Sequence, residues 1–154
     1  MPFFRSERDG EKRSEDYKLF AFRTRPELEA FTGVLNSSLF YLWFVAYSDV
    51  YHCGRELILD FPCDIQALSR SSELLEATME LMQAYRSTAV RRAIRYKATG
   101  LVEYDEFYSR DVKPQIDRVD MVLARLLGLP DALLDFVLNF DVKYRAAAQQ
   151  SEDD

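Results

Sequence analysis

The chain has 154 residues, 48% of them hydrophobic and 30% charged, and a formal net charge of −6 at pH 7. This length suits one domain that buries roughly 70% of the surface of its unfolded chain, and the composition argues against wholesale disorder. The longest apolar run, residues 39–47, is too short for a membrane helix, and no signal peptide is visible. Two cysteines and one histidine are few for disulfides, a His-based metal site or a catalytic triad, so we expect a cytoplasmic protein with reduced thiols.

Three parts of the chain differ in charge and apolar pattern. Residues 1–15 alternate charges without an apolar period, which predicts a mobile leader. Residues 146–154 predict a frayed acidic tail. We expect residues 16–145 between them to form a single helical domain.

The N-terminal half combines strand and helix signals. Residues 17–23 are rich in aromatics and residues 56–61 are apolar up to a proline, so each segment predicts a short strand. Thr24, followed by Arg25-Pro26 and glutamates, predicts the start of a helix. Residues 39–47 are apolar on every side, which predicts the central buried helix. Four aromatic side chains there could stack on nucleic-acid bases, although core packing explains them better: Tyr41, Trp43, Phe44 and Tyr47.

The longest predicted element runs from Ser71 to Lys97, where neither proline nor glycine occurs. Acidic residues suit its start and basic residues its end, and a single helix there would have up to 27 residues and a length of about 40 Å. Pro114 predicts the start of another helix that ends at Gly128, and Asp131 predicts the start of a short final helix. We therefore expect a mainly α fold, with one or two short strands and one long helix.

A broad apolar stripe follows one face of this long helix. Because the predicted helix is longer than a small core needs, it should pack along another long helix or a partner. The candidates for contact with a partner helix are Leu74, Leu75, Met79, Met82 and Tyr85.

Basic residues gather in one stretch of an otherwise acidic chain. Between Tyr85 and Lys97 there are five basic residues and no acidic ones, whereas residues 101–154 carry six basic and twelve acidic residues. Arginines interleaved with tyrosines suit phosphate contact, but basic residues at a helix end also complement its dipole, and both explanations stay open. The candidates for contact with a DNA backbone are Arg86, Arg91, Arg92, Arg95 and Lys97.

No catalytic motif is visible in the sequence: it lacks a glycine-rich phosphate loop, a G-x-S-x-G elbow and H-E-x-x-H. Asp111, Asp117 and Asp120 could share a cation, but a solvated helix face is the simpler interpretation. His52 beside Cys53 could form a thiolate–imidazole pair, although a turn histidine next to a half-buried thiol explains it better.

Two groups of motifs follow each other along the chain. LNSSLFYLWFVAYSDVYH at residues 35–52 precedes ELILDFP at 56–62, and VEYDEFYSRDVKPQIDRVDMVLARLLGL at 102–129 precedes LLDFVLNFDVKYR at 133–145. Together they resemble the C-terminal target-recognition region of type IIG-like restriction-modification enzymes, which contain an adenine-specific DNA methyltransferase. The resemblance implies a region that packs long helices on the body of the protein and helps to choose the DNA sequence.

In that family the catalytic domain binds S-adenosylmethionine through a glycine-rich loop and holds the flipped adenine with an Asn-Pro-Pro-aromatic motif. Neither motif occurs here, and the acid and Glu-x-Lys pattern of the nucleases is missing too. The resemblance therefore implies no catalytic residue and no cofactor in this chain, with S-adenosylmethionine on a catalytic partner.

Two functions are consistent with these observations. The first is a non-catalytic target-recognition or assembly module of a site-specific DNA adenine methyltransferase, in a restriction-modification or phage-defence system, acting with a catalytic polypeptide. Such a module would bind DNA weakly alone, would not bind membranes, and could also self-associate. The alternative is a helical interaction scaffold or regulator that does not contact DNA and binds a protein through the stripe between Leu74 and Tyr85.

Overall fold

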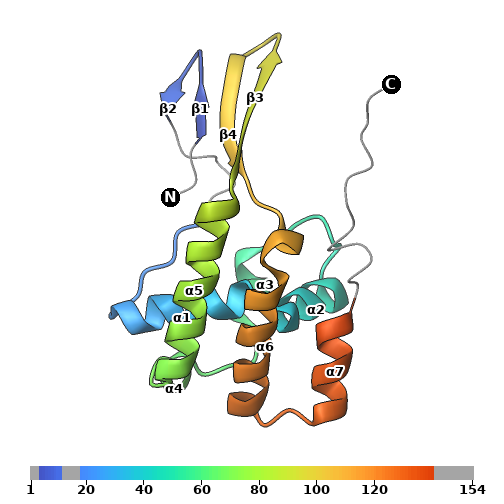
Figure 1. Ribbon diagram of the computed structural model, residues 1–154. Helices are drawn as coiled ribbons and strands as arrows, with labels where there is room; N and C mark the ends of the chain where they lie inside the picture. Colours follow the sequence, from blue (N-terminus) through green and yellow to red (C-terminus); the bar gives the residue numbers. More distant parts are fainter. Residues whose placement is uncertain (1–3, 12–17, 141–154) are drawn as a thin grey trace.

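The computed structural model describes residues 4–11 and 18–140, in which a helical body carries a projecting antiparallel sheet (Figure 1). The helices are α1 (Arg25–Leu35), α2 (Ser38–Tyr47), α3 (Arg55–Leu59), α4 (Ile65–Leu68), α5 (Ser72–Thr88), α6 (Lys113–Leu127) and α7 (Asp131–Asn139). A short 3-10 turn, Ser109–Val112, precedes α6. The strands are β1 (Phe4–Ser6), β2 (Gly10–Glu11), β3 (Val90–Tyr96) and β4 (Gly100–Glu106).

The prediction of a mainly α fold with one helix of up to 27 residues is wrong. The fold is α+β, and α5, the longest helix in the described chain, has 17 residues and ends at Thr88. The hydroxyls of Ser87 and Thr88 both donate to the carbonyl of Ala84 at 2.9 Å, a local alternative to further helix bonds. β-Formers then alternate along β3, and Gly100 takes a left-handed φ of 71° after the turn that leads into β4.

The four strands lie in the order β2-β1-β4-β3, and all neighbours are antiparallel. β1 pairs with β4 over the register Phe4↔Tyr104 to Ser6↔Val102, so residues 4–11 belong to the sheet, although the sequence predicts a mobile leader there. The other residues of the predicted leader, and the predicted acidic tail, lie outside the described residues. Residues 4–11 and residues 90–106 therefore form one open sheet together.

The core lies where α1, α5 and α6 meet. The predicted start of α1 is confirmed, because Thr24 accepts the N–H of Glu27 while the Glu27 carboxylate accepts the N–H of Thr24. The start of α5 at Ser71 and the ends of α6 at Pro114 and Gly128 are confirmed as well. The side chains at the centre of this core include Val34, Leu74, Leu81, Ile116, Val119 and Leu123.

Two predicted strands are not strands in the structure. Residues 18–22 have no regular structure, and Phe20 and Phe22 instead cover Phe31 of α1, with ring centroids 5.1 and 4.9 Å away. Most of residues 56–61 belongs to the short helix α3, which buries Ile58. In both segments the aromatic or apolar residues pack against helices, so their β-propensity is overridden by tertiary contacts.

Helix α2 is not the central buried helix that its composition predicts. Only Ser38 and Phe40 are buried, and Tyr47 at its end is 66% exposed. No single helix among the described residues is long and apolar enough to cross a membrane; α1 and α2 reach that threshold only together, with a bend of 62° between them. The centre of the body is α6, with six buried residues.

A buried carboxylate of α6 holds the N-terminus of α2. Asp120 has no exposed surface, and its Oδ1 accepts the N–H groups of Ser38 at 2.8 Å and Leu39 at 3.4 Å. The Ser37 hydroxyl accepts the next N–H, that of Phe40, at 3.1 Å. The first three N–H groups of α2, which have no partners inside the helix, are therefore all satisfied.

Replacing this carboxylate should cost more than replacing an ordinary surface residue. We expect Asp120→Ala to lower the free energy of unfolding by about 3 kcal/mol, because two buried N–H groups lose their acceptor. Asp120→Asn keeps an oxygen in place and should cost less. Urea unfolding followed by circular dichroism measures both, and equal losses would argue against the capping role.

The closest approach of α1 and α5 depends on a glycine. Gly33 is buried, and a Cβ built on it would collide with the hydroxyl of Thr78. The Thr78 hydroxyl is itself buried and forms no hydrogen bond with the described residues. A small residue on α1 thus lets α5 come close enough to complete the core.

The Gly33–Thr78 contact predicts that the effect of Gly33→Ala on stability changes sign when Thr78 is also replaced. Gly33→Ala alone should destabilise the protein by about 2 kcal/mol, because the helices must separate. In a Thr78→Ala background the same change meets only ordinary contacts and should be neutral or stabilising by up to about 1 kcal/mol, the helix propensity of alanine. A double-mutant cycle by chemical unfolding tests this, and additive effects would contradict it.

Candidate nucleic-acid interface

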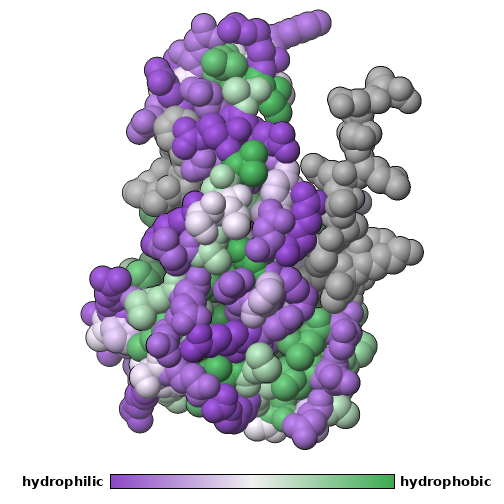
Figure 2. Space-filling view, viewed as in Figure 1, coloured by the Kyte–Doolittle hydropathy of each residue, from purple (hydrophilic) through white to green (hydrophobic). Residues whose placement is uncertain are grey.

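The projecting sheet carries exposed basic residues on its edge strand β3. Every residue of β3 is exposed, and β3 is an edge strand with β4 on one side only. Figure 2 shows this end of the molecule covered mainly by hydrophilic residues. An exposed strand of seven residues is a surface that a large partner can reach from both faces.

The predicted basic cluster is not on one helix. Arg86 lies near the end of α5, while Arg91, Arg92 and Arg95 lie on β3 and Lys97 follows it in the turn. Since strand side chains alternate between faces, Arg91 and Arg95 share one face and Arg92 points to the other. The explanation by a helix dipole therefore fails for the residues beyond Thr88.

Carboxylates hold the three arginines of β3. Arg91 pairs with Asp105 at 2.6 Å and Arg92 with Glu106 at 2.7 Å, both across from β4. Arg95 contacts Glu7 at 3.3 Å, on the turn between β1 and β2. These partners are the residues that sequence analysis missed, because the register of the sheet brings them together and no local pattern reveals them.

The pair on the second face, Arg92 and Glu106, also includes the Tyr108 hydroxyl. Hydrogen bonds from the Tyr108 hydroxyl and from Arg92 keep the pKa of Glu106 below its usual range. The same contacts with Glu106 and Tyr108 raise the pKa of Arg92. The N–H donors of Arg92 are therefore shared between Glu106 and Tyr108. Lys97, in contrast, forms no ion pair with the described residues.

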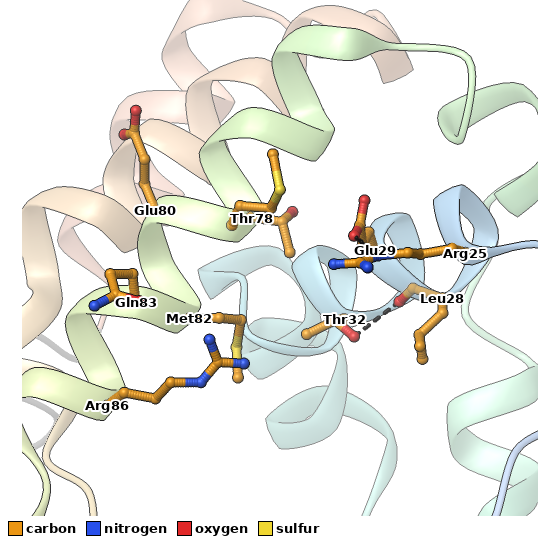
Figure 3. A pocket seen from close by; sticks show the side chains of 10 residues that line it. Arg25, Leu28, Glu29, Thr32, Thr78, Glu80, Met82, Gln83 and Arg86 are labelled. Carbon is orange, nitrogen blue, oxygen red and sulfur yellow. Dashed lines mark hydrogen bonds and ion pairs between the residues drawn. The ribbon is translucent and has the colours of Figure 1, made fainter. Parts of the chain in front are cut away.

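The predicted partner stripe is divided by the fold. Leu74 is fully buried in the protein's own core, and Leu75 is partly buried against it. Met79 is 49% exposed, and Met79 and Met82 line a groove of about 880 Å³ between α5 and α1 (Figure 3). Tyr85 is half-buried, with its ring edge-on to Phe107. The methionine part of the stripe thus faces this groove, and Met82 and Tyr85 also line a smaller one, of about 310 Å³, beside Phe107.

The predicted acidic trio does not gather around a cation. Asp117 pairs with Lys113, Asp120 caps α2 and Asp111 is exposed. Within the described residues no group of three metal-ligating side chains is found. Asp117 therefore serves a local ion pair, and Asp120 serves a long-range contact with the start of α2.

The aromatic set on α2 is partly surface and partly core. Trp43 donates its indole N–H to the carbonyl of Leu57 at 3.1 Å and stacks on Tyr47 at 4.1 Å. Both line a second groove, of about 490 Å³, beside Phe61. Exposed Tyr47 shows that an apolar helix can lie at the edge of the body, which composition alone does not reveal.

Comparison with known proteins gives no relative of this chain: no protein-family model, no curated protein and no solved structure matches it.

His52 contacts Asp49 and does not form a pair with Cys53. Its Nδ1 lies 2.7 Å from the Asp49 carboxylate, which also accepts the N–H groups of Tyr51 and His52. Burial raises the pKa of the Cys53 thiol, which disfavours a thiolate. The loop between α2 and α3 is thus organised around one carboxylate.

The Asp49 carboxyl should titrate unusually low. The His52 side chain, followed by the two backbone N–H groups, lowers its pKa from 3.8 to about 2. The contribution of this contact is therefore complete above the ordinary pKa and is lost as pH falls through about 2. Carbon-detected NMR titration measures it: His52→Ala should raise the pKa of Asp49 part of the way back, and an unchanged value would contradict this.

Proposed function

We propose that this chain is a non-catalytic DNA-recognition module of an adenine-specific DNA methyltransferase system, acting with a separate catalytic polypeptide that binds S-adenosylmethionine. The observation that carries DNA contact is the projecting β3–β4 hairpin with its exposed arginines. The methyltransferase system is proposed from the motifs at residues 35–62 and 102–145 alone. Such a module would work in the cytoplasm, where its DNA lies.

The free edge of the hairpin would be the part that approaches DNA. Because β1 and β2 lie beside β4, the hairpin is the outer part of a four-stranded sheet, and β3 alone presents an open edge. A strand of seven residues reaches about 24 Å, or roughly two thirds of a helical turn of DNA. Arginines on both faces of β3 would then contact phosphates along the DNA backbone.

The ion pairs limit the affinity of the hairpin alone. Residues 90–106 carry four basic and three acidic side chains, and phosphates must compete with Glu7, Asp105 and Glu106 for the arginines of β3. A few phosphate contacts give dissociation constants of about 10⁻⁴–10⁻⁶ M at physiological salt. Weak binding that a catalytic partner reinforces is therefore the expected behaviour.

A second candidate function is a protein-interaction scaffold that does not contact DNA. The groove lined by Met79 and Met82 favours it, because methionines are common on adaptable binding surfaces. Binding through that groove would depend little on salt, which separates the two functions.

DNA binding is tested by removing the arginines of one face of the hairpin. Fluorescence anisotropy with a labelled duplex should show weak, salt-dependent binding of the wild type. Arg91→Ala/Arg95→Ala should weaken it and reduce the slope of log K against log salt by about two, because two phosphate contacts are lost.

A matched control removes two arginines elsewhere. Arg118 and Arg125 are ion-paired with glutamates of α5 on the helical body, and Arg118→Ala/Arg125→Ala changes the net charge equally. This control should leave the salt slope unchanged. Equal effects of the two double mutants, or a wild type that does not bind duplex even at low salt, would contradict the proposed interface.

A further inference from the structure

The projecting sheet has two chemically different faces. Residues that are paired across neighbouring strands share a face, so the register places Phe4, Tyr104 and Arg92 in one row across β1, β4 and β3. Tyr96 lies on the same face, two rows closer to the tip of the hairpin and opposite Gly100. We call this the aromatic face, because it carries aromatic rings beside a guanidinium.

The aromatic face carries fewer carboxylates than the opposite face. Among the described strands its charged residues are Arg92 and Glu106, and Glu106 already accepts hydrogen bonds from Arg92 and Tyr108. A polyanion that approaches the opposite face meets three carboxylates. The charged strand residues of that face are Arg5, Arg91, Arg95, Glu11, Glu103 and Asp105.

No helix within the described part of the chain covers the aromatic face. β1, β3 and β4 contact mainly one another and have at most marginal contacts with the helices, and the sheet projects beyond the body (Figure 1). Tyr96 is 50% exposed and Ile94 40% exposed, while Phe4 and Tyr104 are partly exposed. Because an antiparallel sheet ordinarily packs its apolar face on the protein core, an apolar face beyond the core indicates a surface for a ligand.

Unpaired nucleic-acid bases fit this combination of groups. Bases stack on aromatic rings and on guanidinium planes, and their phosphates need cations nearby. Arg92 stands in the row of rings, and Lys97, which forms no ion pair with the described residues, follows Tyr96 at the tip. From Phe4 to Arg92 the face measures about 10 Å, and from Arg92 to Tyr96 about 13 Å, which is room for two or three bases.

We propose that the aromatic face binds a single-stranded segment of DNA, with bases stacked on Tyr104 and Tyr96. The inference rests on the proposed function and names the form of DNA that this side of the sheet takes. A methyltransferase that extrudes its target base leaves unpaired nucleotides beside the catalytic site. The aromatic face would hold such nucleotides, while the free edge of β3 contacts the neighbouring duplex.

Fluorescence anisotropy of the whole chain with labelled oligo(dT) of about 12 nucleotides tests this inference. The wild type should bind at low salt, and Tyr104→Leu and Tyr96→Leu should each weaken binding by about tenfold, because an aliphatic side chain does not replace base stacking. Tyr104→Phe keeps the ring and should bind within about threefold of the wild type. Neither leucine variant should weaken binding to duplex, because a duplex hides the faces of its bases.

A matched control removes an aromatic ring away from the sheet. Tyr51, in the loop between α2 and α3, is 88% exposed, and Tyr51→Leu should leave oligo(dT) binding unchanged. Circular dichroism shows whether each variant is folded, and Tyr96 at the sheet edge gives a second site if Tyr104→Leu is unstable.

The inference and the proposed function can fail separately. Binding of duplex without binding of oligo(dT) would overturn the inference and leave the proposed function standing, whereas binding of oligo(dT) alone would do the reverse. Four other results would also overturn the inference: equal binding by the leucine variants, tighter binding of oligo(rU) than of oligo(dT), no binding of any nucleic acid, and self-association without DNA that Tyr104→Leu abolishes in sedimentation velocity.

Discussion

The carboxylate of Asp120 links two distant parts of the chain, and the arrangement of the helical body depends on it. It lies in the middle of α6 and accepts N–H groups at the start of α2, 82 residues earlier in the chain. Only Asn36 and Ser37 separate α1 from α2, so α2 must turn sharply, by 62°, with its first N–H groups inside the protein. A buried carboxyl oxygen at a helix N-terminus satisfies those groups, which makes the bend stable.

Local signals in the sequence predict where helices begin, and here they are right. Thr24, Ser71 and Pro114 mark helix starts through contacts within one turn, which a sequence shows directly. The end of α5 was missed because no glycine or proline marks it. The alternation from Val90 to Tyr96 is short and interrupted by arginines with good helix propensity, so only the pairing with β4 across the hairpin decides for a strand.

The candidate interface was predictable only in part. The exposure of Arg91, Arg92 and Arg95 follows from their charge, but their arrangement on two faces of a strand does not. Their carboxylate partners, Glu7 and the acidic residues of β4, are set by strand register and by a contact 88 residues apart. A basic cluster in a sequence therefore overstates the positive electrostatic potential around it, because the fold places carboxylates within 3.3 Å of three of its members.

On the proposed function, the distribution of charge would also orient the sheet relative to DNA. With a net charge of −6 and its acidic residues concentrated after residue 100, the chain as a whole is repelled by a polyanion. The short-range contacts of the β3 arginines can act only when the hairpin points toward the duplex and the helical body points away. Repulsion then rejects the other orientations, and the projection of the sheet beyond the body in Figure 1 makes the favourable orientation sterically accessible. On the proposed function, the hairpin, with four basic and three acidic residues, would therefore contribute more to orientation than to affinity.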